Sequence, residues 1–248
     1  MNRQIPQRAI IIGATSGIGY ETARLLLKEG WTLGIAGRRE EKLKAFQAEA
    51  PDRIHFRVID IREEEAGFHL LNLIEEVGGM ELYLHCSGIG HQNFNLTPYI
   101  ETDTAETNVT GFIRMVNTAF HYFARQGKGH IAVISSIAGT KGLGIAPAYS
   151  ATKRFQNTYI DALEQLAYMQ KKKAIHFTDI RPGFVKTDLL NDGKNYPMLM
   201  KPDKVARRIV RAIHRKKRVV IIDKRYSLLV WGWRLIPRWL WKRLPIKN

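Results

Sequence analysis

The chain has 248 residues, of which 45% are hydrophobic and 25% charged, and this globular composition excludes a disordered or fibrous protein. Its single cysteine, Cys86, excludes an internal disulfide, and no apolar run reaches the roughly 18 residues that a membrane-spanning helix needs. The first seven residues are polar and lead directly into a strand-like segment. We therefore expect a cytoplasmic protein without a signal peptide.

The net charge of +16 is concentrated near the C-terminus. From Lys201 to Asn248 there are 16 Lys and Arg against 2 acidic residues, so 16 − 2 = +14 of the charge lies there. A strongly basic region is typical of contact with nucleic acid, an anionic membrane surface or an acidic partner.

Strand and helix patterns alternate along the chain without a linker or a repeat. Short apolar runs predict buried parallel strands at Arg8–Ile12, Trp31–Ala36, His55–Ile59, Leu82–His85, His130–Ile134, Ala174–Ile180 and Val219–Ile222. Helical spacing predicts helices at Tyr20–Lys28, Glu40–Glu49, Glu63–Glu76, Thr102–Arg125 and Tyr149–Met169. The predicted fold is a single α/β domain, a doubly wound parallel sheet of about seven strands with helices on both faces.

A glycine-rich turn joins the first strand to the first helix. Gly13, Gly17 and Gly19 span this turn, together with Thr15, Ser16 and Ile18. Glycines in this context let the backbone approach a pyrophosphate, which then rests on the positive end of the helix. The alternative is a tight turn without a ligand, and the strand–turn–helix context favours the nucleotide.

Two arginines follow the second strand, where a nucleotide-binding unit often carries an acidic residue. An acid there would bind the 2′-hydroxyl of the adenosine ribose, whereas Arg38 and Arg39 suit a 2′-phosphate. The pattern predicts NADP(H) in preference to NAD(H). The alternative is that both arginines cap a surface loop.

A phenol and an ammonium, Tyr149 and Lys153, lie four residues apart and share one face of a helix. A fixed cation near the phenol favours phenolate and lowers its pKa, which makes a general acid or base. The spacing alone is common, but Ser136 and several glycines follow other strands. Because parallel strands end at one edge of a sheet, these groups converge there and suit a carbonyl that is polarised and protonated as hydride arrives.

These motifs together resemble the short-chain dehydrogenase/reductases, a family with G-x-x-x-G-x-G and Y-x-x-x-K motifs. The resemblance extends from Arg8 to about Ile222. It implies a Rossmann-like catalytic domain, which we assign to residues 1–224, followed by a basic, tryptophan-rich tail at 225–248. Two departures are Ile12, where threonine is usual, and His85-Cys86-Ser87-Gly88 in place of Asn-Asn-Ala-Gly.

The resemblance also implies roles for individual residues. Ser136 precedes Tyr149 by 13 residues, which is the family spacing for the catalytic serine, and we therefore choose it over Ser135. The implied catalytic residues are Asn108, Ser136, Tyr149 and Lys153. The implied cofactor-binding residues are Gly13, Thr15, Ser16, Gly17, Ile18, Gly19, Arg38, Arg39, Asp60, Ile61, Gly88, Tyr149, Lys153, Pro182, Gly183, Val185 and Thr187.

The implied reaction is the reduction of a ketone by NADPH, or the reverse oxidation of an alcohol. Lys153 binds the nicotinamide ribose and lowers the pKa of Tyr149, Tyr149 donates a proton to the substrate oxygen, and Ser136 holds that oxygen. Asn108 holds a water that links Lys153 to solvent. Family members commonly form dimers or tetramers through the helices at Thr102–Arg125 and Ala148–Met169, so a homodimer or homotetramer is expected.

Substrate choice is expected to depend on Phe184–Pro202, whose apolar side chains favour an apolar substrate such as a keto-lipid or a 3-oxoacyl compound. Four of the five tryptophans lie in the tail among arginines, which is typical of a membrane interface. The equal alternative is that the tail folds over the active-site mouth or against a dimer partner.

Two other classes of function remain open, a non-catalytic NADP-binding protein on the same fold and nucleic-acid binding by the basic run Lys204–Arg218. The intact catalytic set argues against the first, and the lack of a nucleic-acid module argues against the second. The histidines show no metal-ligand spacing, so no metal is expected.

Overall fold

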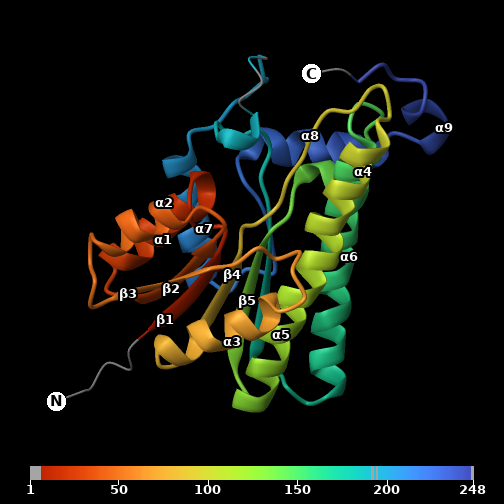
Figure 1. Cartoon of the computed structure of the whole chain (residues 1–248). Coiled ribbons are helices and arrows are strands. Elements are labelled where there is room, and N and C mark those ends of the chain that lie inside the picture. The colour runs from red at the N-terminus through yellow and green to blue at the C-terminus, as the bar shows by residue number, and fades with distance from the viewer. Residues whose placement is uncertain (1–6, 191–192, 194, 247–248) are drawn as a thin grey trace.

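The seven predicted strands form one parallel sheet in a computed structural model, which describes residues 7–190, 193 and 195–246. The strand order is β3-β2-β1-β4-β5-β6-β7 (Figure 1). The strands are β1 (Arg8–Ile12), β2 (Thr32–Gly37), β3 (Ile54–Val58), β4 (Leu82–His85), β5 (Gly129–Ile134), β6 (Ile175–Arg181) and β7 (Val219–Ile221). The order reverses between β1 and β4, and ligands of open α/β sheets bind at such switch points.

Helices cover both faces of the sheet (Figure 1). One face packs against α1 (Gly17–Lys28), α2 (Glu40–Gln47) and α7 (Pro202–His214). The other packs against α3 (Ala66–Glu76), α5 (Phe112–Gln126) and α6 (Pro147–Met169), and α4 (Pro98–Ala105) precedes α5. Because each face has its own apolar core, the central strands are buried on both sides, as their continuous apolar runs predict.

The strand register brings the functional loops to one level. Ile12, the last residue of β1, pairs with Ala36 on one side and with His85 on the other. The turns after β1, β2 and β4 therefore leave the sheet side by side at its carboxyl edge, the upper edge in Figure 1.

The long helix predicted at Thr102–Arg125 is not uniform. It begins earlier, at Pro98, and a π-helical segment, Glu106–Gly111, separates α4 from α5. Such a segment changes which backbone groups pair within a helix, and π-bulges are frequent at functional sites. Hydrophobic periodicity could not reveal it. The helix predicted at Glu63–Glu76 differs in its start as well, since it begins three residues later than predicted, at Ala66.

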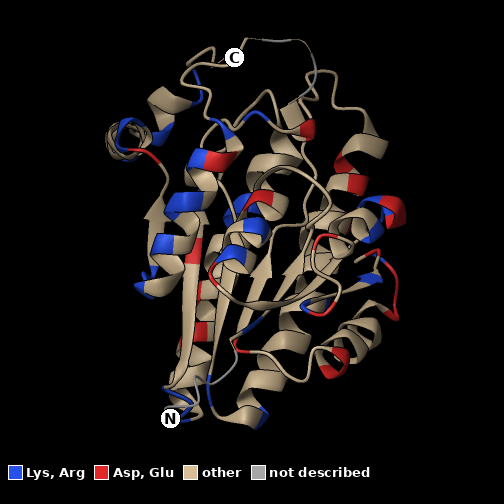
Figure 2. Cartoon of the chain, turned by 90° about the vertical axis from the view of Figure 1, so that its left-hand side faces the viewer, with Lys and Arg blue, Asp and Glu red and all other residues tan. Residues whose placement is uncertain are grey.

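The basic run Lys204–Arg218 includes most of the amphipathic helix α7. Its inner face is buried through Val205, Ile209 and Ile213. Figure 2 shows the positions of the Lys and Arg residues in blue along the ribbon on this side of the molecule. Several pair with acids: Arg207 lies 2.7 Å from Asp203, Arg208 lies 3.5 Å from Asp223, and Arg218 pairs with Asp161 and Glu164. This arrangement is that of a solvated helix face.

The segment predicted as a tail folds into α8 (Lys224–Leu235) and α9 (Arg238–Trp241), which lie across the carboxyl edge of the sheet (Figure 1). Tyr226 is fully buried in the core. Lys141 donates to the carbonyl of Ile236 at 2.8 Å, and the Trp241 indole donates to the carbonyl of Gly142 at 2.7 Å. These bonds join the segment to the loop that follows β5.

Candidate active site

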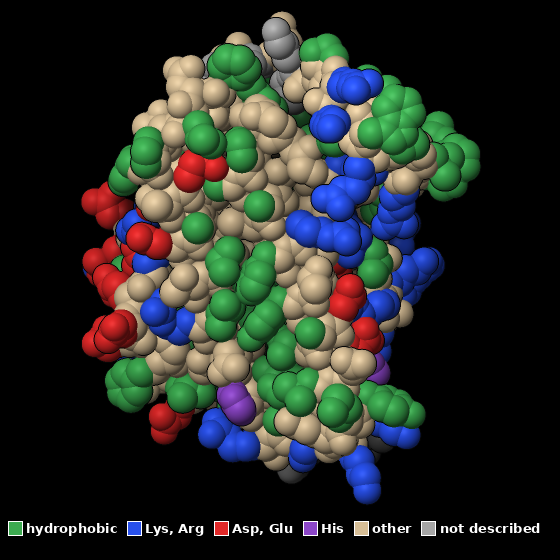
Figure 3. All heavy atoms as spheres, turned by 90° about the vertical axis from the view of Figure 1, so that its right-hand side faces the viewer, with side chains coloured by type: hydrophobic (Ala, Val, Ile, Leu, Met, Phe, Trp, Pro, Cys, Tyr) green, Lys and Arg blue, Asp and Glu red, His purple; other side chains and the backbone are tan. Residues whose placement is uncertain are grey.

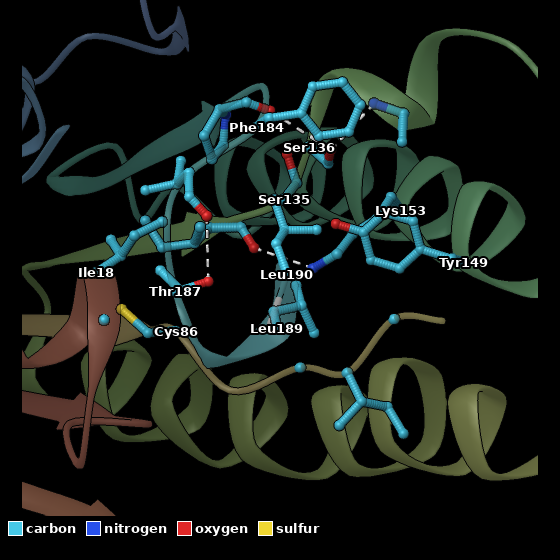
Figure 4. A pocket seen from close by; sticks show the side chains of 18 of the residues that line it. Ile18, Cys86, Ser135, Ser136, Tyr149, Lys153, Phe184, Thr187, Leu189 and Leu190 are labelled. Atoms are coloured by element: carbon cyan, nitrogen blue, oxygen red, sulfur yellow. Dashed lines mark hydrogen bonds between the residues drawn. The ribbon is translucent and has the colours of Figure 1, made fainter. Parts of the chain in front are cut away.

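A cleft of about 1060 Å³ opens at the carboxyl edge of the sheet. It is lined by every residue predicted above to be catalytic or cofactor-binding except Asn108. Figure 4 shows Ile18 and Cys86 toward one side of this cleft, with Tyr149 toward the other. The loops after six strands, β1 to β6, and the start of α6 thus enclose a single space.

The glycine turn forms one end of the cleft. Gly13 has φ +89° and Gly17 φ +57°, values that side chains other than glycine rarely adopt. A Cβ on Gly19 would lie 2.2 Å from the carbonyl oxygen of Gly13, so helix and strand can approach only without it. Ser16 begins α1 without a side-chain cap, and no acid lies in the first turn. The uncapped amides and the helix dipole therefore suit an anion.

Arg39 lies directly over this turn. Its guanidinium donates to Thr15 Oγ1 at 2.7 Å, to Ser16 Oγ at 2.6 Å and to the Asp188 carboxylate at 2.9 Å. Arg38 is more exposed and lies 4.0 Å from Asp60. Hydrogen bonds from Arg62 lower the pKa of Asp60, so this acid is ionised at the rim of the cleft. Two guanidiniums thus flank the place where the second strand ends.

The two serines after β5 point in different directions. Ser135 donates to Asp179 and accepts from the Asn157 amide at 2.8 Å, inside a buried polar cluster. Ser136 Oγ accepts from the Ala138 amide at 3.1 Å, donates to the Pro182 carbonyl at 3.4 Å and also hydrogen-bonds with Tyr149. Of the two serines, only Ser136 therefore hydrogen-bonds with the Tyr149 phenol.

Tyr149 and Lys153 lie on the first turns of α6, with the Lys153 ammonium 5.8 Å from the centre of the Tyr149 ring. Desolvation raises the pKa of the Tyr149 phenol, and the hydrogen bond with Ser136 opposes that rise only in part. This direction is opposite to the lowering expected from Lys153. Burial also lowers the pKa of Lys153 to about 8, because a charged amine loses its hydration there.

A phenol with a raised pKa is protonated at neutral pH, and only this form can donate a proton. The main chain at Gly90 lies against the Tyr149 ring, since a Cβ on Gly90 would lie 2.4 Å from a ring carbon. The phenol is thus held between this loop and α6.

Asn108 differs most from its predicted role. Its side chain is fully buried, accepts from the Ile89 amide at 2.9 Å and donates to the Ile89 carbonyl at 2.7 Å. It braces the loop after β4 and does not line the cleft. Its main-chain carbonyl accepts a hydrogen bond from Gln156 Nε2 at 2.9 Å.

His85 and Cys86 replace the usual pair of asparagines after β4. His85 is fully buried, its Nδ1 lies 2.8 Å from the Tyr83 hydroxyl, and desolvation lowers its pKa to about 3. Burial raises the pKa of the Cys86 thiol. The Cys86 thiol is protonated at physiological pH and is therefore a poor nucleophile, and the low pKa of His85 makes it a poor base.

The opposite wall of the cleft is apolar and comes from the C-terminal half. It includes Leu189, Leu190 and Met198 from the segment Phe184–Pro202, which is predicted to select the substrate and is called the lid below, and Tyr226, Leu229 and Trp233 from α8. The contribution of α8 corresponds to one of the two alternatives stated for the tail, the one in which it folds over the active-site mouth. Lid residues 191, 192 and 194 lie outside the described part of the chain.

Gln156 also escaped prediction, although a signal for it was present. Tyr149, Lys153 and Gln156 are spaced i, i+4 and i+7, so all three share one helix face.

Within residues 7–190, 193 and 195–246, no group of three or more His, Cys, Asp or Glu side chains could hold a metal ion. In the same residues no helix combines the length and the apolar character required to cross a bilayer.

Comparison with known proteins places this fold and site in a family. Residues 7–195 match the family model for short chain dehydrogenases. An uncharacterized oxidoreductase of Myxococcus xanthus is 31% identical over 196 residues, covering 77% of this chain and 76% of its own. The dehydrogenase/reductase SDR family member 7B of Xenopus tropicalis is 28% identical over 237 residues, covering 86% and 76%. The chain belongs to the short-chain dehydrogenase/reductases and is an oxidoreductase.

Among solved structures, an actinorhodin polyketide ketoreductase with NADPH superimposes with a TM-score of 0.76 at 24% identity, covering 90% of this chain and 97% of that one. At this identity the agreement supports the shared fold and leaves the substrate open.

Proposed function

We propose that the protein reduces the carbonyl of an apolar substrate with NADPH. The observation that supports this most directly is the arrangement of the cleft, with an anion-binding turn at one end, Ser136, Tyr149 and Lys153 beyond it, and an apolar wall opposite. The intact set of polar groups makes a non-catalytic NADP-binding protein the weaker alternative.

The residues present fit a dinucleotide. A Cβ on Gly13 would lie 2.7 Å from the Ser87 amide nitrogen, so this glycine lets the turn pack closely against the loop after β4. The uncapped start of α1 would hold the pyrophosphate, and Asp60 and Ile61 border the place for the adenine. Pro182, Gly183, Val185 and Thr187 border the nicotinamide end. NADPH, when bound, supplies the hydride.

The chain's own residues would handle the proton and the oxygen. Tyr149, protonated at neutral pH, donates its proton to the substrate oxygen, and Ser136 donates a hydrogen bond to the same oxygen. Lys153 binds the ribose and supplies positive charge beside the phenolate that forms. Because Lys153 has a pKa of about 8, this charge is lost as the pH rises through that value, and reduction becomes slower.

Arg38 and Arg39 support the preference for NADPH. Both are cationic, both follow β2, and no acid lies at the end of that strand to bind a free 2′-hydroxyl. Arg39 is already oriented by Thr15, Ser16 and Asp188, which reduces the entropy lost when it binds a phosphate.

The experiment is a screen of NADPH oxidation with keto-lipids, 3-oxoacyl thioesters and small ketones, repeated with NADH. Tyr149→Phe should reduce kcat by about 1,000-fold and leave NADPH affinity unchanged, because it removes only the acidic hydrogen. Tyr168→Phe, an exposed tyrosine on the same helix, is the control. Normal turnover by Tyr149→Phe would refute the assignment.

A homodimer or homotetramer is the proposed assembly. Figure 3 shows hydrophobic side chains along the middle of the face that carries α4, α5 and α6. Phe155 and Tyr159 of α6 are partly buried there and stack with their ring centres 5.4 Å apart. Sedimentation equilibrium would test this assembly, and a monomer at micromolar concentration would contradict it.

We also propose that the outer face of α8 and α9 contacts an anionic membrane surface. This outer face consists of Leu228, Trp231, Leu235 and Trp239, each at least 59% exposed. Exposed arginines and lysines adjoin it, namely Arg225, Arg234, Arg238, Lys242 and Arg243, and Figure 3 shows basic side chains beside large hydrophobic ones at the upper end of that face. Aromatic rings with cations favour the headgroup region of anionic lipid.

The same helix covers the cleft with its inner face, where Tyr226, Leu229 and Trp233 lie. Both alternatives predicted for the tail are therefore compatible, because α8 presents one apolar face to the cleft and another to solvent. A membrane at the outer face would bring an apolar substrate next to the cleft.

Co-sedimentation with phosphatidylglycerol-containing and pure phosphatidylcholine vesicles tests this contact. The double variant Trp231→Ser with Trp239→Ser should lose most binding to anionic vesicles, whereas Phe68→Ser, an exposed aromatic residue on α3, should keep it. Equal binding by both variants would contradict the proposal. Truncation at Arg225 is less suitable, since it also removes the buried Tyr226.

A further inference from the structure

Gln156 connects two residues of the proposed catalytic set. It lies one helical turn after Lys153, and only 1% of its surface is exposed. The Lys153 ammonium donates to Gln156 Oε1 at 3.0 Å, and Gln156 Nε2 donates to the Asn108 carbonyl at 2.9 Å. The orientation of the amide follows from its partners, because an ammonium can only donate and a carbonyl can only accept.

The π-helical segment provides the acceptor for this bridge. Asn108 lies inside Glu106–Gly111, where the i→i+5 pattern replaces the i→i+4 pattern of an α-helix. The Asn108 carbonyl bonds to a side chain of α6 here, and the Asn108 amide is occupied by Ile89 and Thr152.

We propose that Gln156 is a positioning residue that fixes the Lys153 ammonium by bridging it to the Asn108 carbonyl, in the place predicted for a water. The proposal rests on the proposed reductase function for its catalytic consequence, but the bridge itself concerns residues of this chain alone.

The bridge orients Lys153 toward the cleft. An ammonium has three donor hydrogens, and two of them are used by Gln156 Oε1 and by the Ile134 carbonyl at 3.2 Å. Among the described residues the third has no acceptor, and Lys153 lines the cleft, so this hydrogen is available to a ribose hydroxyl. An amide held at both ends cannot rotate or exchange as a water does.

The bridge also limits proton transfer. A water can accept a proton on one side and release another, whereas an amide nitrogen and oxygen exchange protons only through an unfavourable tautomer. We infer that protons reach Lys153 from the cleft and not through Asn108.

The groups around Lys153 are uncharged or already paired, so the dipole of the Gln156 side-chain amide matters for the charged form of Lys153. Asp179 faces it from β6 but is paired with Arg181 at 2.6 Å, the neutral His85 faces it from the end of β4, and the protonated Cys86 faces it from the loop that follows. Tyr149 faces it from the same helix and is also uncharged at neutral pH. With desolvation lowering the pKa of Lys153, the Gln156 oxygen is a close acceptor that favours the charged form.

The test replaces Gln156 with Met, which removes the hydrogen-bond acceptor, and with Glu, which adds a negative charge on a side chain of the same size. The control is Gln126→Met, because Gln126 likewise donates to main-chain carbonyls, those of Met80 and Lys128, but at the far end of α5. The Lys153 titration is followed by NMR of the lysine 13Cε resonances, with Lys153→Arg for assignment.

We expect the Lys153 pKa to fall by about one unit in Gln156→Met and to rise by about one unit or more in Gln156→Glu. The alkaline limb of kcat/KM for reduction should move in the same directions, with about a fivefold lower kcat/KM for Gln156→Met at pH 8, because the charged fraction of Lys153 falls by that factor. Gln126→Met should move neither quantity.

A packing role alone would lower stability in Gln156→Met and leave the Lys153 titration unchanged in that variant, which would overturn the proposal. Gln156→Glu preserves shape, so it secures the measurement if the Met variant does not fold. The NMR titration does not require turnover. If no carbonyl is reduced but the titration shifts as expected, the proposed function is wrong and the bridge is correct.

Discussion

The two walls of the cleft are held in different ways. The strand-end wall consists of the loops after β1, β4 and β5 with the first turns of α1 and α6, and its Ser136 and Lys153 are only 7% and 5% exposed. The C-terminal wall consists of residues 184–190, 195–200 and α8, where Leu189 and Leu199 are 41% and 42% exposed.

Backbone contacts fix the first wall, since the Gly13 amide donates to Ala36 and the Cys86 amide to Ile12, each at 2.8 Å. A single side chain, that of Tyr226, connects several parts of the second wall. The Tyr226 hydroxyl donates to Pro197 at 2.9 Å and accepts from the Phe184 amide at 3.1 Å. Groups that need exact positions for chemistry thus lie on the wall with least freedom, and the wall that selects the substrate can vary without disturbing them.

Among the changes that compare the two walls, the largest effect is expected from Gly90→Ala in the strand-end wall. The added Cβ would lie 2.4 Å from the Tyr149 ring, and a displacement of about 1 Å at a catalytic group can reduce kcat by about 100-fold. Steady-state kinetics measures this. Gly144→Ala is the matched control, because no atom lies within 4 Å of a Cβ there. A kcat unchanged by Gly90→Ala would show that this wall is less rigid than we infer.

A smaller effect is expected at Arg39, which joins the two walls through Thr15 and Asp188. Arg39→Ala should raise the KM for NADPH about tenfold and that for NADH much less, since a 2′-phosphate loses a charged partner. Lys44→Ala removes the same charge from the exposed surface of α2 and serves as control. Equal losses for both cofactors would assign Arg39 to holding the walls together.

The smallest effect is expected from Tyr226→Phe in the C-terminal wall. Without the hydroxyl, the Phe184 amide loses its partner, so the free energy of unfolding should fall by about 1–2 kcal/mol. The KM for an apolar substrate should rise about threefold with kcat unchanged. Chemical denaturation measures the free energy of unfolding, and steady-state kinetics measures KM and kcat. A loss confined to kcat would contradict the division of roles between the walls.

Much of the strand-end wall could be predicted from the sequence. Each of these strands is a short apolar run that leads into a glycine or a polar residue of the predicted site, and a parallel sheet brings the ends of the strands together. The predicted residues from Gly13 to Thr187, apart from Asn108, accordingly line one cleft. Some strands end one residue away from the predicted position, as β2 ends at Gly37 and not at Ala36, and this difference leaves the result unchanged.

The sequence by itself determined the sheet, the glycine turn and the helix that carries Tyr149 and Lys153, because these depend on local periodicity and on contacts one turn apart. Only the tertiary structure decided the protonation of Tyr149, the bracing role of Asn108, the bridge through Gln156 and the docking of α8 over the cleft. These depend on burial and on partners 19 to 48 positions away. Asn108 lies 19 positions from Ile89, Tyr226 lies 42 from Phe184 and Gln156 lies 48 from Asn108, and no local pattern encodes such contacts.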